Sequence, residues 1–250
     1  MNLAPSFQRA IVNPALGCLS QLQRLNLSHA DVDADGAAAL APSLSRLTAL
    51  TKIDLCHAGI GVPRPAGIGS AGVQALAPGL SHLSALEVLD LDGNRIGAAG
   101  AQALAPALGR LSSLQSLYLA RNDIGADGAA ALAPSLALRG KRKRLVSLRL
   151  ANNGIGVAGV RSLAPALGHL SRLTVLDLSG NGIGDAGVLL VAHALARLTF
   201  FLELGLDRGN GVSAAGVAAF RAGVPDSVWT ASDFDGARLS RVRCSHSRVA

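Results

Sequence analysis

Aromatic side chains are scarce in this sequence, at 3% of 250 residues, although half of the chain is hydrophobic. A core must therefore be built from Leu, Ala, Ile and Val, small side chains that stack many times over. Charged residues are also few, at 16%, which is below the usual quarter. A disordered chain would be polar and strongly charged, so that class is excluded.

Long apolar runs are missing as well. Mean hydropathy is +0.38, but Gly, Pro, Asp or Arg interrupts every stretch before the roughly 18–20 residues that a membrane-spanning helix needs. Residues 1–22 have neither the basic start nor the unbroken apolar segment of a signal peptide. The sequence therefore predicts no membrane insertion and a cytoplasmic location, in which Cys18, Cys56 and Cys244 are free thiols.

One six-residue pattern, Leu-x-x-Leu-x-Leu, recurs along the chain. Its copies begin at Leu22, Leu50 (with Ile in the second slot), Leu86, Leu114, Leu145 and Leu173, and a degenerate copy begins at Phe201. The base spacing is 28 residues, and two longer spacings of 36 and 31 contain insertions at 62–69 and 138–144. The pattern alternates apolar and polar residues, as in a short strand. It is followed by Asn in most copies, by Ile-Gly-x-x-Gly and by apolar residues at helical spacing.

Two features inside the repeat have structural interpretations. Leu-Ala-Pro recurs in the helical segments at 40–42, 76–78, 104–106, 132–134 and 163–165. A proline inside a helix costs about 3 kcal/mol unless its missing N–H was unpaired anyway, so we expect each helix to bend or restart there. The recurring glycines are turn residues rather than a nucleotide site, because a dinucleotide fingerprint occurs once per site.

These residues resemble the ribonuclease-inhibitor-like subfamily of leucine-rich repeats over roughly residues 14 to 220. Ribonuclease inhibitor, the Ran GTPase-activating protein and the repeat arms of NOD-like receptors share this unit. The resemblance implies an α/β solenoid, a horseshoe with a parallel sheet on the concave face and helices on the convex face. It also implies that the recurring Asn is structural, bonding backbone in a buried turn. The physics agrees, since stacked repeats bury a continuous core that one repeat cannot.

We divide the chain into residues 1–21, a partial first repeat, residues 22–222, a solenoid of about seven repeats, and residues 223–250, a tail outside the repeat. The beginning aligns with the back half of a repeat, because 14–22 matches 106–114 without gaps. Either residues 1–13 form a cap, or the sequence is a piece of a longer protein, and we favour the second. The tail is interpreted as a cap followed by a disordered end.

Strand geometry predicts which side chains reach the concave face. The fourth and sixth residues of the pattern point into the core, so the third, fifth and seventh point to the concave side. We predict a partner-binding surface there and at the adjoining edge position, formed by Asp54, Asp90, Asp92, Tyr118, Arg121, Arg149 and Asp177. Tyr and Arg are enriched at binding hot spots. The alternative is that any concave sheet needs polar residues and these are simply the ones present.

Catalytic and metal chemistry find little support. Cys56, His57, His29 and Asp54 have the chemistry of zinc ligands, but no known spacing motif joins them. A Cys/His nucleophile pair lacks a third, orienting residue. We therefore predict no metal, no cofactor and no enzymatic activity.

Positive charge is concentrated in two segments. Five basic residues lie at Arg139 and Lys141–Arg144, and four arginines follow the last acid, Asp235, so the net charge of +7 leaves the rest of the chain near −2. Lys141–Arg144 is either a nuclear-import signal, a phosphate-binding loop or a solvated insertion at a repeat junction, and we favour the last. Nucleic acid would be contacted only there and through the tail, without aromatics for base stacking.

We predict a monomeric scaffold that binds another protein through the concave face, in the cytoplasm or the nucleus. The resemblance implies two alternatives, a regulator of a Ran-like small GTPase and a fragment of a NOD-like receptor sensing arm.

Overall fold

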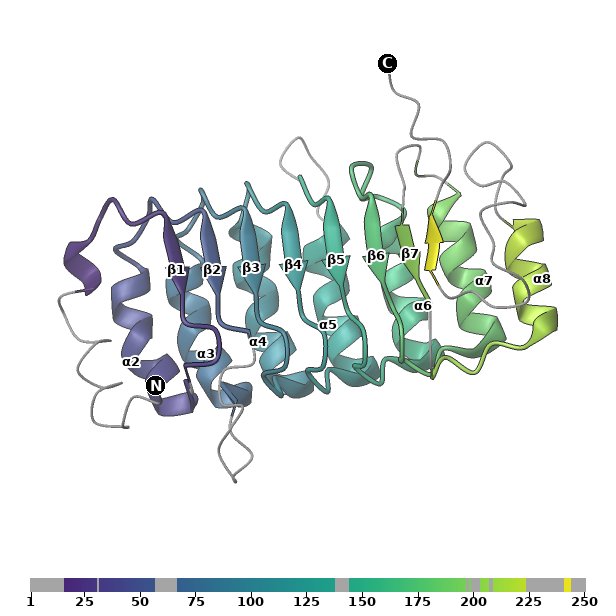
Figure 1. Ribbon diagram of the computed structural model, residues 1–250, viewed down its shortest axis with the longest axis horizontal. Coiled ribbons are helices and arrows are strands. Elements are labelled where there is room, and N and C mark those ends of the chain that lie inside the picture. The colour runs from purple at the N-terminus through teal and green to yellow at the C-terminus, as the bar shows by residue number, and fades with distance from the viewer. Residues whose placement is uncertain are drawn as a thin grey trace, which may run out of the picture.

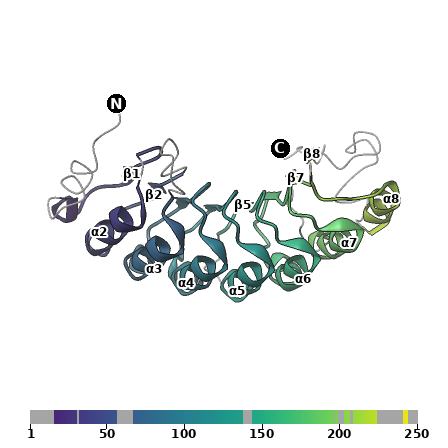
Figure 2. The same cartoon turned by 90° about the horizontal axis from the view of Figure 1, so that it is seen from below.

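The computed structural model describes residues 16–30, 32–56, 67–137, 144–196, 198, 203–206, 209–223 and 241–243. Within them, short strands alternate with helices along a solenoid (Figure 1), whose curvature is seen when it is turned by 90° (Figure 2). The strands line the inner side of the curve and the helices form its outer side (Figure 2). The sheet and the helices are therefore two separate layers, with the concave face formed by the sheet.

In the described part of the chain, no helix has both the length and the apolar character needed to cross a membrane.

The elements follow one another in the order that the repeat predicts. The strands are β1 (Arg24–Asn26), β2 (Lys52–Asp54), β3 (Val88–Asp90), β4 (Ser116–Tyr118), β5 (Ser147–Arg149), β6 (Val175–Asp177), β7 (Glu203–Gly205) and β8 (Arg241–Arg243). A 3-10 helix, η1 (Leu16–Cys18), precedes them. The α-helices are α2 (Ala34–Leu44), α3 (Gly69–Leu80), α4 (Gly97–Arg110), α5 (Gly125–Ala137), α6 (Gly156–Leu167), α7 (Gly184–Leu195) and α8 (Ala214–Gly223).

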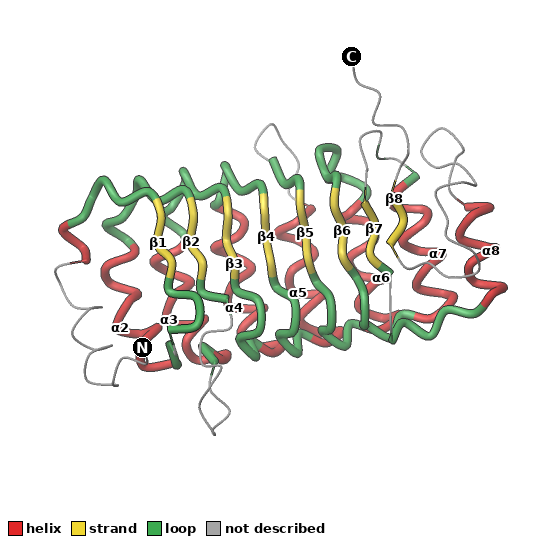
Figure 3. The backbone as a smooth tube through the Cα atoms, viewed as in Figure 1, coloured by secondary structure: helices red, strands yellow, loops and turns green. Residues whose placement is uncertain are grey.

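The described strands form one sheet in sequence order (Figure 3). From β1 to β7 all pairs are parallel, and each residue pairs with the equivalent residue of the next repeat. The 36- and 31-residue spacings leave this register unchanged. Both insertions therefore leave the strand ladder intact, the first falling between β2 and α3 and the second between α5 and β5.

The last strand departs from the repeat. Within the tail that we interpreted as a cap followed by a disordered end, residues 241–243 form β8, which pairs antiparallel with β7. An antiparallel partner has no counterpart in the 28-residue period, so the repeat pattern contains no signal for it. The other residues of the predicted tail after 223, like residues 1–15 of the predicted partial repeat, lie outside the described residues.

The core runs without a break between the sheet and the helices. It consists almost entirely of Leu, Ile, Val and Ala, with one fully buried aromatic side chain among the described residues, Phe220 of α8. Phe220 lies in α8, the last helix among the described residues. The scarcity of aromatics is thus a property of the repeat.

A ladder of buried asparagines joins the repeats below the sheet. Each side chain donates from Nδ2 to a leucine carbonyl of the preceding repeat at 2.8–3.1 Å. In all but the first member, Oδ1 accepts the backbone N–H of the preceding asparagine at 2.8–2.9 Å. The members are Asn94, Asn122, Asn153, Asn181 and Asn210, each at most 3% exposed. This confirms the structural interpretation of the recurring Asn.

The two glycines of Ile-Gly-x-x-Gly are needed for different physical reasons, as the copy at the start of α5 shows. Gly125 has a φ of +65°, a conformation that an L side chain strains, and its N–H donates to the carbonyl of Asn153 at 2.8 Å. Gly128 lies against the preceding helix. A Cβ there would lie 2.6 Å from Cγ2 of Ile124 and 3.1 Å from Cα of Ala98. The first glycine permits the turn, and the second permits close helix packing.

The recurring prolines do not restart the helices. Pro42, Pro78, Pro106, Pro134 and Pro165 all lie inside continuous helices, close to their C-terminal ends. All five are exposed on the convex side. Water can therefore bond the carbonyl that lacks an N–H partner, which explains why the helix is tolerated through the proline.

Candidate binding surface on the concave face

The fifth position of each strand pattern forms one row across the sheet. In strand order the row reads Asn26, Asp54, Asp90, Tyr118, Arg149, Asp177 and Gly205, and each member is the register partner of the next. Neighbouring strands lie about 4.8 Å apart, so neighbouring side chains of the row can touch. Five of the seven residues predicted from the sequence belong to this row.

Four members of the row share a local role that the sequence reasoning missed. The Oδ1 atoms of Asn26, Asp54, Asp90 and Asp177 accept the backbone N–H two residues further on, at 2.9–3.2 Å. Each side chain thereby closes a turn where its strand ends, as Asx residues commonly do. The signal was present in the sequence, because Asp or Asn recurs at this position. Some acidic residues of the concave face therefore have a structural role.

Tyr118 and Arg149 replace that turn-closing residue in β4 and β5. Cζ of Arg149 lies 4.7 Å from the centroid of the Tyr118 ring, which is a cation–π contact. Arg149 is exposed and Tyr118 is half-buried. The third and seventh positions beside them hold only small side chains, Ser116, Ala120, Ser147 and Ala151. The pair therefore stands out from its surroundings on the concave face.

Asp92, at the seventh position of the β3 pattern, interacts electrostatically with both Asp90 and Arg149. Its Oδ1 accepts the N–H of Ala120 at 2.6 Å. Burial, followed by repulsion from Asp90, raises the pKa of the Asp92 carboxyl from its ordinary 3.8 to about 6, although Ala120 and Arg149 oppose the shift. The carboxylates of Asp90 and Asp92 thus form a strip of concentrated negative charge.

The negative charge of Asp90 and Asp92 also acts on Cys56, which follows β2. Burial raises the pKa of the Cys56 thiol to about 12, with further contributions from a hydrogen bond to Asp54 and from the charge of Asp90. At neutral pH this thiol is protonated. It is therefore a poor nucleophile, because the thiolate is the reactive form.

Asp54, Cys56 and Asp90 are the described residues that could hold a metal ion. Their ligand atoms all lie within 4.8 Å of one another. Positive charge is already supplied there by Lys52, whose Nζ lies 3.7 Å from Oδ2 of Asp54. His29, which the sequence suggested as a fellow ligand, does not belong to this group, and His57 lies outside the described residues.

The remaining predicted residues flank the central pair. Arg121 is exposed at the edge position after β4, with a φ of +56°. Asp177 of β6 lies on the far side of Arg149 from the acidic strip. Of the basic insertion, only Arg144 is described, and it is exposed. The structure thus brings Asp54, Asp90 and Asp92 together on one side of the pair.

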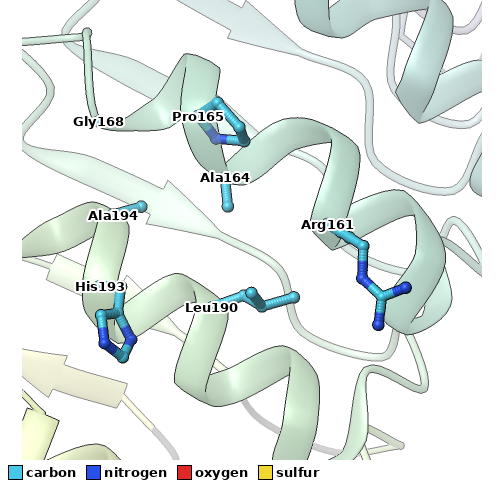
Figure 4. A pocket seen from close by; sticks show the side chains of 7 residues that line it. All are labelled: Arg161, Ala164, Pro165, Gly168, Leu190, His193 and Ala194. Atoms are coloured by element: carbon cyan, nitrogen blue, oxygen red, sulfur yellow. The ribbon is translucent and has the colours of Figure 1, made fainter.

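The convex face has shallow grooves between neighbouring helices. In one, between α6 and α7, Arg161 and His193 lie at opposite ends with Leu190 between them (Figure 4). A second groove, between α3 and α4, is lined by the same repeat positions around Pro78 and Pro106. Because the groove recurs with the repeat, it follows from helix spacing and is not a specialised site.

Comparison with known proteins agrees with this architecture. A family model described as a leucine rich repeat matches residues 20–41, 82–105, 110–133, 145–164 and 169–192. Each matched segment contains or adjoins a strand of the sheet. No curated protein matches the chain.

Proposed function

Because the chain is a leucine-rich-repeat protein, and such repeats generally mediate contacts between proteins, we propose that it binds another protein through its concave face. One observation supports this more than any other. Tyr118 and Arg149 form a preorganised pair that stands among small residues on the open side of the sheet. Tyr and Arg are the residue types whose truncation at an interface most often costs about 2 kcal/mol or more.

The concave face is a better candidate than the convex grooves. On the convex side two grooves are lined by equivalent positions of different repeats, and exposed large hydrophobic side chains are few among the described residues. On the concave side the row of fifth positions departs from its repeating role only at Tyr118, Arg149 and Gly205. Departure from a structural pattern is where a specific function can be encoded.

Leucine-rich-repeat proteins are typically binding scaffolds without enzymatic activity, and the proposed role requires none. The ribonuclease-inhibitor-like subtype stays a prediction. So do the two alternatives it implied, regulation of a Ran-like GTPase and a place in a NOD-like receptor arm. Both rest on the resemblance alone. The hydrolysis of GTP by a small GTPase, with and without the chain, tests the first directly.

The proposed location is the cytoplasm, or the nucleus if the basic insertion acts as an import signal. Most of that insertion, residues 138–143, lies outside the described residues. The proposed partner is a protein bound by a monomer of this chain.

Affinity capture from a lysate of the native host tests the concave-face proposal. The variant combines Asp90→Lys with Arg149→Glu, which reverses charge on both sides of Tyr118. The control is Arg161→Glu, an exposed site in a convex groove. We expect the double variant to capture at least about tenfold less partner than the native chain, while the control captures as much as the native chain. Equal capture by all three proteins, each shown to be folded by circular dichroism, would contradict the proposal.

A further inference from the structure

The surroundings of the Tyr118 ring are asymmetric. Arg149 of β5 covers the ring from one side of β4. The strand on the other side is β3, and there the register partner of Tyr118 is Asp90. One side of the aromatic ring therefore holds a cation of this chain, and the other side is bordered by a carboxylate.

Negative charge accumulates on that second side. Asp90 and Asp92 lie two residues apart and are joined by the hydrogen bond from the Asp92 N–H to Oδ1 of Asp90, at 3.0 Å. Asp54 is the register partner of Asp90 on β2. Two cations of this chain already act on these carboxylates, because Nζ of Lys52 lies 3.7 Å from Oδ2 of Asp54 and Arg149 lowers the pKa of Asp92, yet burial and Asp90 keep that pKa raised. A further positive charge placed against Asp90 and Asp92 would relieve their mutual repulsion.

Resting on the proposed function, we propose that the protein partner presents a basic side chain, Lys or Arg, which docks between the Tyr118 ring and the carboxylates of Asp90 and Asp92. A carboxylate beside an aromatic face matches both parts of such a side chain. The charged end pairs with the carboxylates, and the stem or guanidinium packs on the ring.

The opposite polarity fits less well. An acidic group of the partner would have to approach Arg149, the cation that stacks on Tyr118. It would meet Asp177 in the register position on one side and Asp92, which interacts with Arg149, on the other. A carboxylate there faces repulsion from two fixed negative groups.

Three capped tripeptides test the proposal, differing only in a central Arg, Glu or Leu between two alanines. Each is titrated into the ¹⁵N-labelled full chain at low ionic strength, because exposed pairs are screened by salt. Backbone amide shifts report the place of binding. We expect the Arg peptide to shift the amides of Asp90, Asp92 and Tyr118, and the Glu and Leu peptides to leave them unchanged.

Two variants test which carboxylate binds the Arg peptide. Asp90→Asn removes the negative charge but keeps the Oδ1 acceptor that closes the turn, and Asn26 shows that an asparagine makes the same turn, at 2.9 Å. Asp177→Asn is the matched control, since Asp177 closes an equivalent turn at 3.0 Å on the far side of Arg149. We expect Asp90→Asn to weaken the Arg peptide at least about fivefold, and Asp177→Asn less than about twofold.

Tyr118→Leu keeps an apolar side chain and removes the ring. It should weaken the binding of the Arg peptide without changing where the peptide binds. The proposal is overturned if the Arg peptide binds Asp90→Asn as well as the native chain, or shifts only amides outside β2–β4. A Glu peptide that shifts the amides around Arg149 would also overturn it. Any of these results leaves the concave face as the partner surface, whose own failure is seen in the capture experiment with charge-reversed variants.

Discussion

Replacing Asn153 with alanine removes the central member of the asparagine ladder. In the native chain its Nδ2 donates to the carbonyl of Leu119 at 2.8 Å and to that of Leu150 at 2.9 Å. Its Oδ1 accepts the N–H of Asn122 at 2.9 Å. The side chain is 1% exposed, so water does not replace these partners without entering the core.

The loss in free energy of unfolding caused by Asn153→Ala depends on which of its partners are left without a hydrogen bond. The Leu150 carbonyl keeps a second donor, Nδ2 of Asn181 at 2.9 Å. The Leu119 carbonyl, the Asn122 N–H and the Ile124 N–H, which lies 3.3 Å from Oδ1, lose the hydrogen bonds that Asn153 supplied. A buried polar group without a partner costs about 1–3 kcal/mol, so three of them should lower the free energy of unfolding by at least about 3 kcal/mol.

Urea unfolding followed by circular dichroism at 222 nm measures this loss. The control is Asn152→Gly, because the neighbouring Asn152 is exposed and has a φ of +56°, which glycine adopts without strain. We expect the control to change the free energy of unfolding by less than about 0.5 kcal/mol. A loss below about 1 kcal/mol for Asn153→Ala, with an unchanged slope, would refute the view that the ladder holds the repeats together.

Three further predictions concern other residues. Gly128→Ala should destabilise the chain by about 1–3 kcal/mol in the same urea assay, because the added Cβ overlaps Ile124; an unchanged midpoint would count against it. The native-state pKa of Asp92, about 6, lies above its ordinary 3.8, so the folded chain binds more protons between these values. Raising the pH from about 4 to 7 should therefore lower stability by about 1–2 kcal/mol through Asp92, and Asp92→Asn should abolish that part of the slope. Iodoacetamide at pH 8 should alkylate the exposed Cys18 well before Cys56, whose pKa of about 12 keeps it protonated; equal labelling in peptide mass spectra would contradict this.

Much of the fold could be predicted because the same strand and helix pattern occurs several times in the sequence. The alternation around Leu89 and the 28-residue period define a strand and its register together, and β1 to β7 follow them. β8 could not be predicted in this way. It occurs once, pairs antiparallel, and depends on a contact with β7 that no period encodes.

The candidate surface could be predicted in position but not in chemistry. Strand geometry placed Asp90, Tyr118 and Arg149 in one row, and the structure has them so. The sequence did not reveal that Asp90 closes a turn, nor that Arg149 stacks on Tyr118. It also missed that Asp92 accepts a hydrogen bond from the N–H of Ala120 in the neighbouring repeat. Features that need two strands at once require the three-dimensional structure.

The most direct test of the concave face as the binding surface is site-specific photocrosslinking in the native host. A benzophenone amino acid replaces Tyr118 in one protein and Arg161 of the convex groove in another, so that each face carries one aromatic probe. We predict a discrete crosslinked protein from position 118 and none from position 161. Crosslinking from position 161 alone would contradict the central claim.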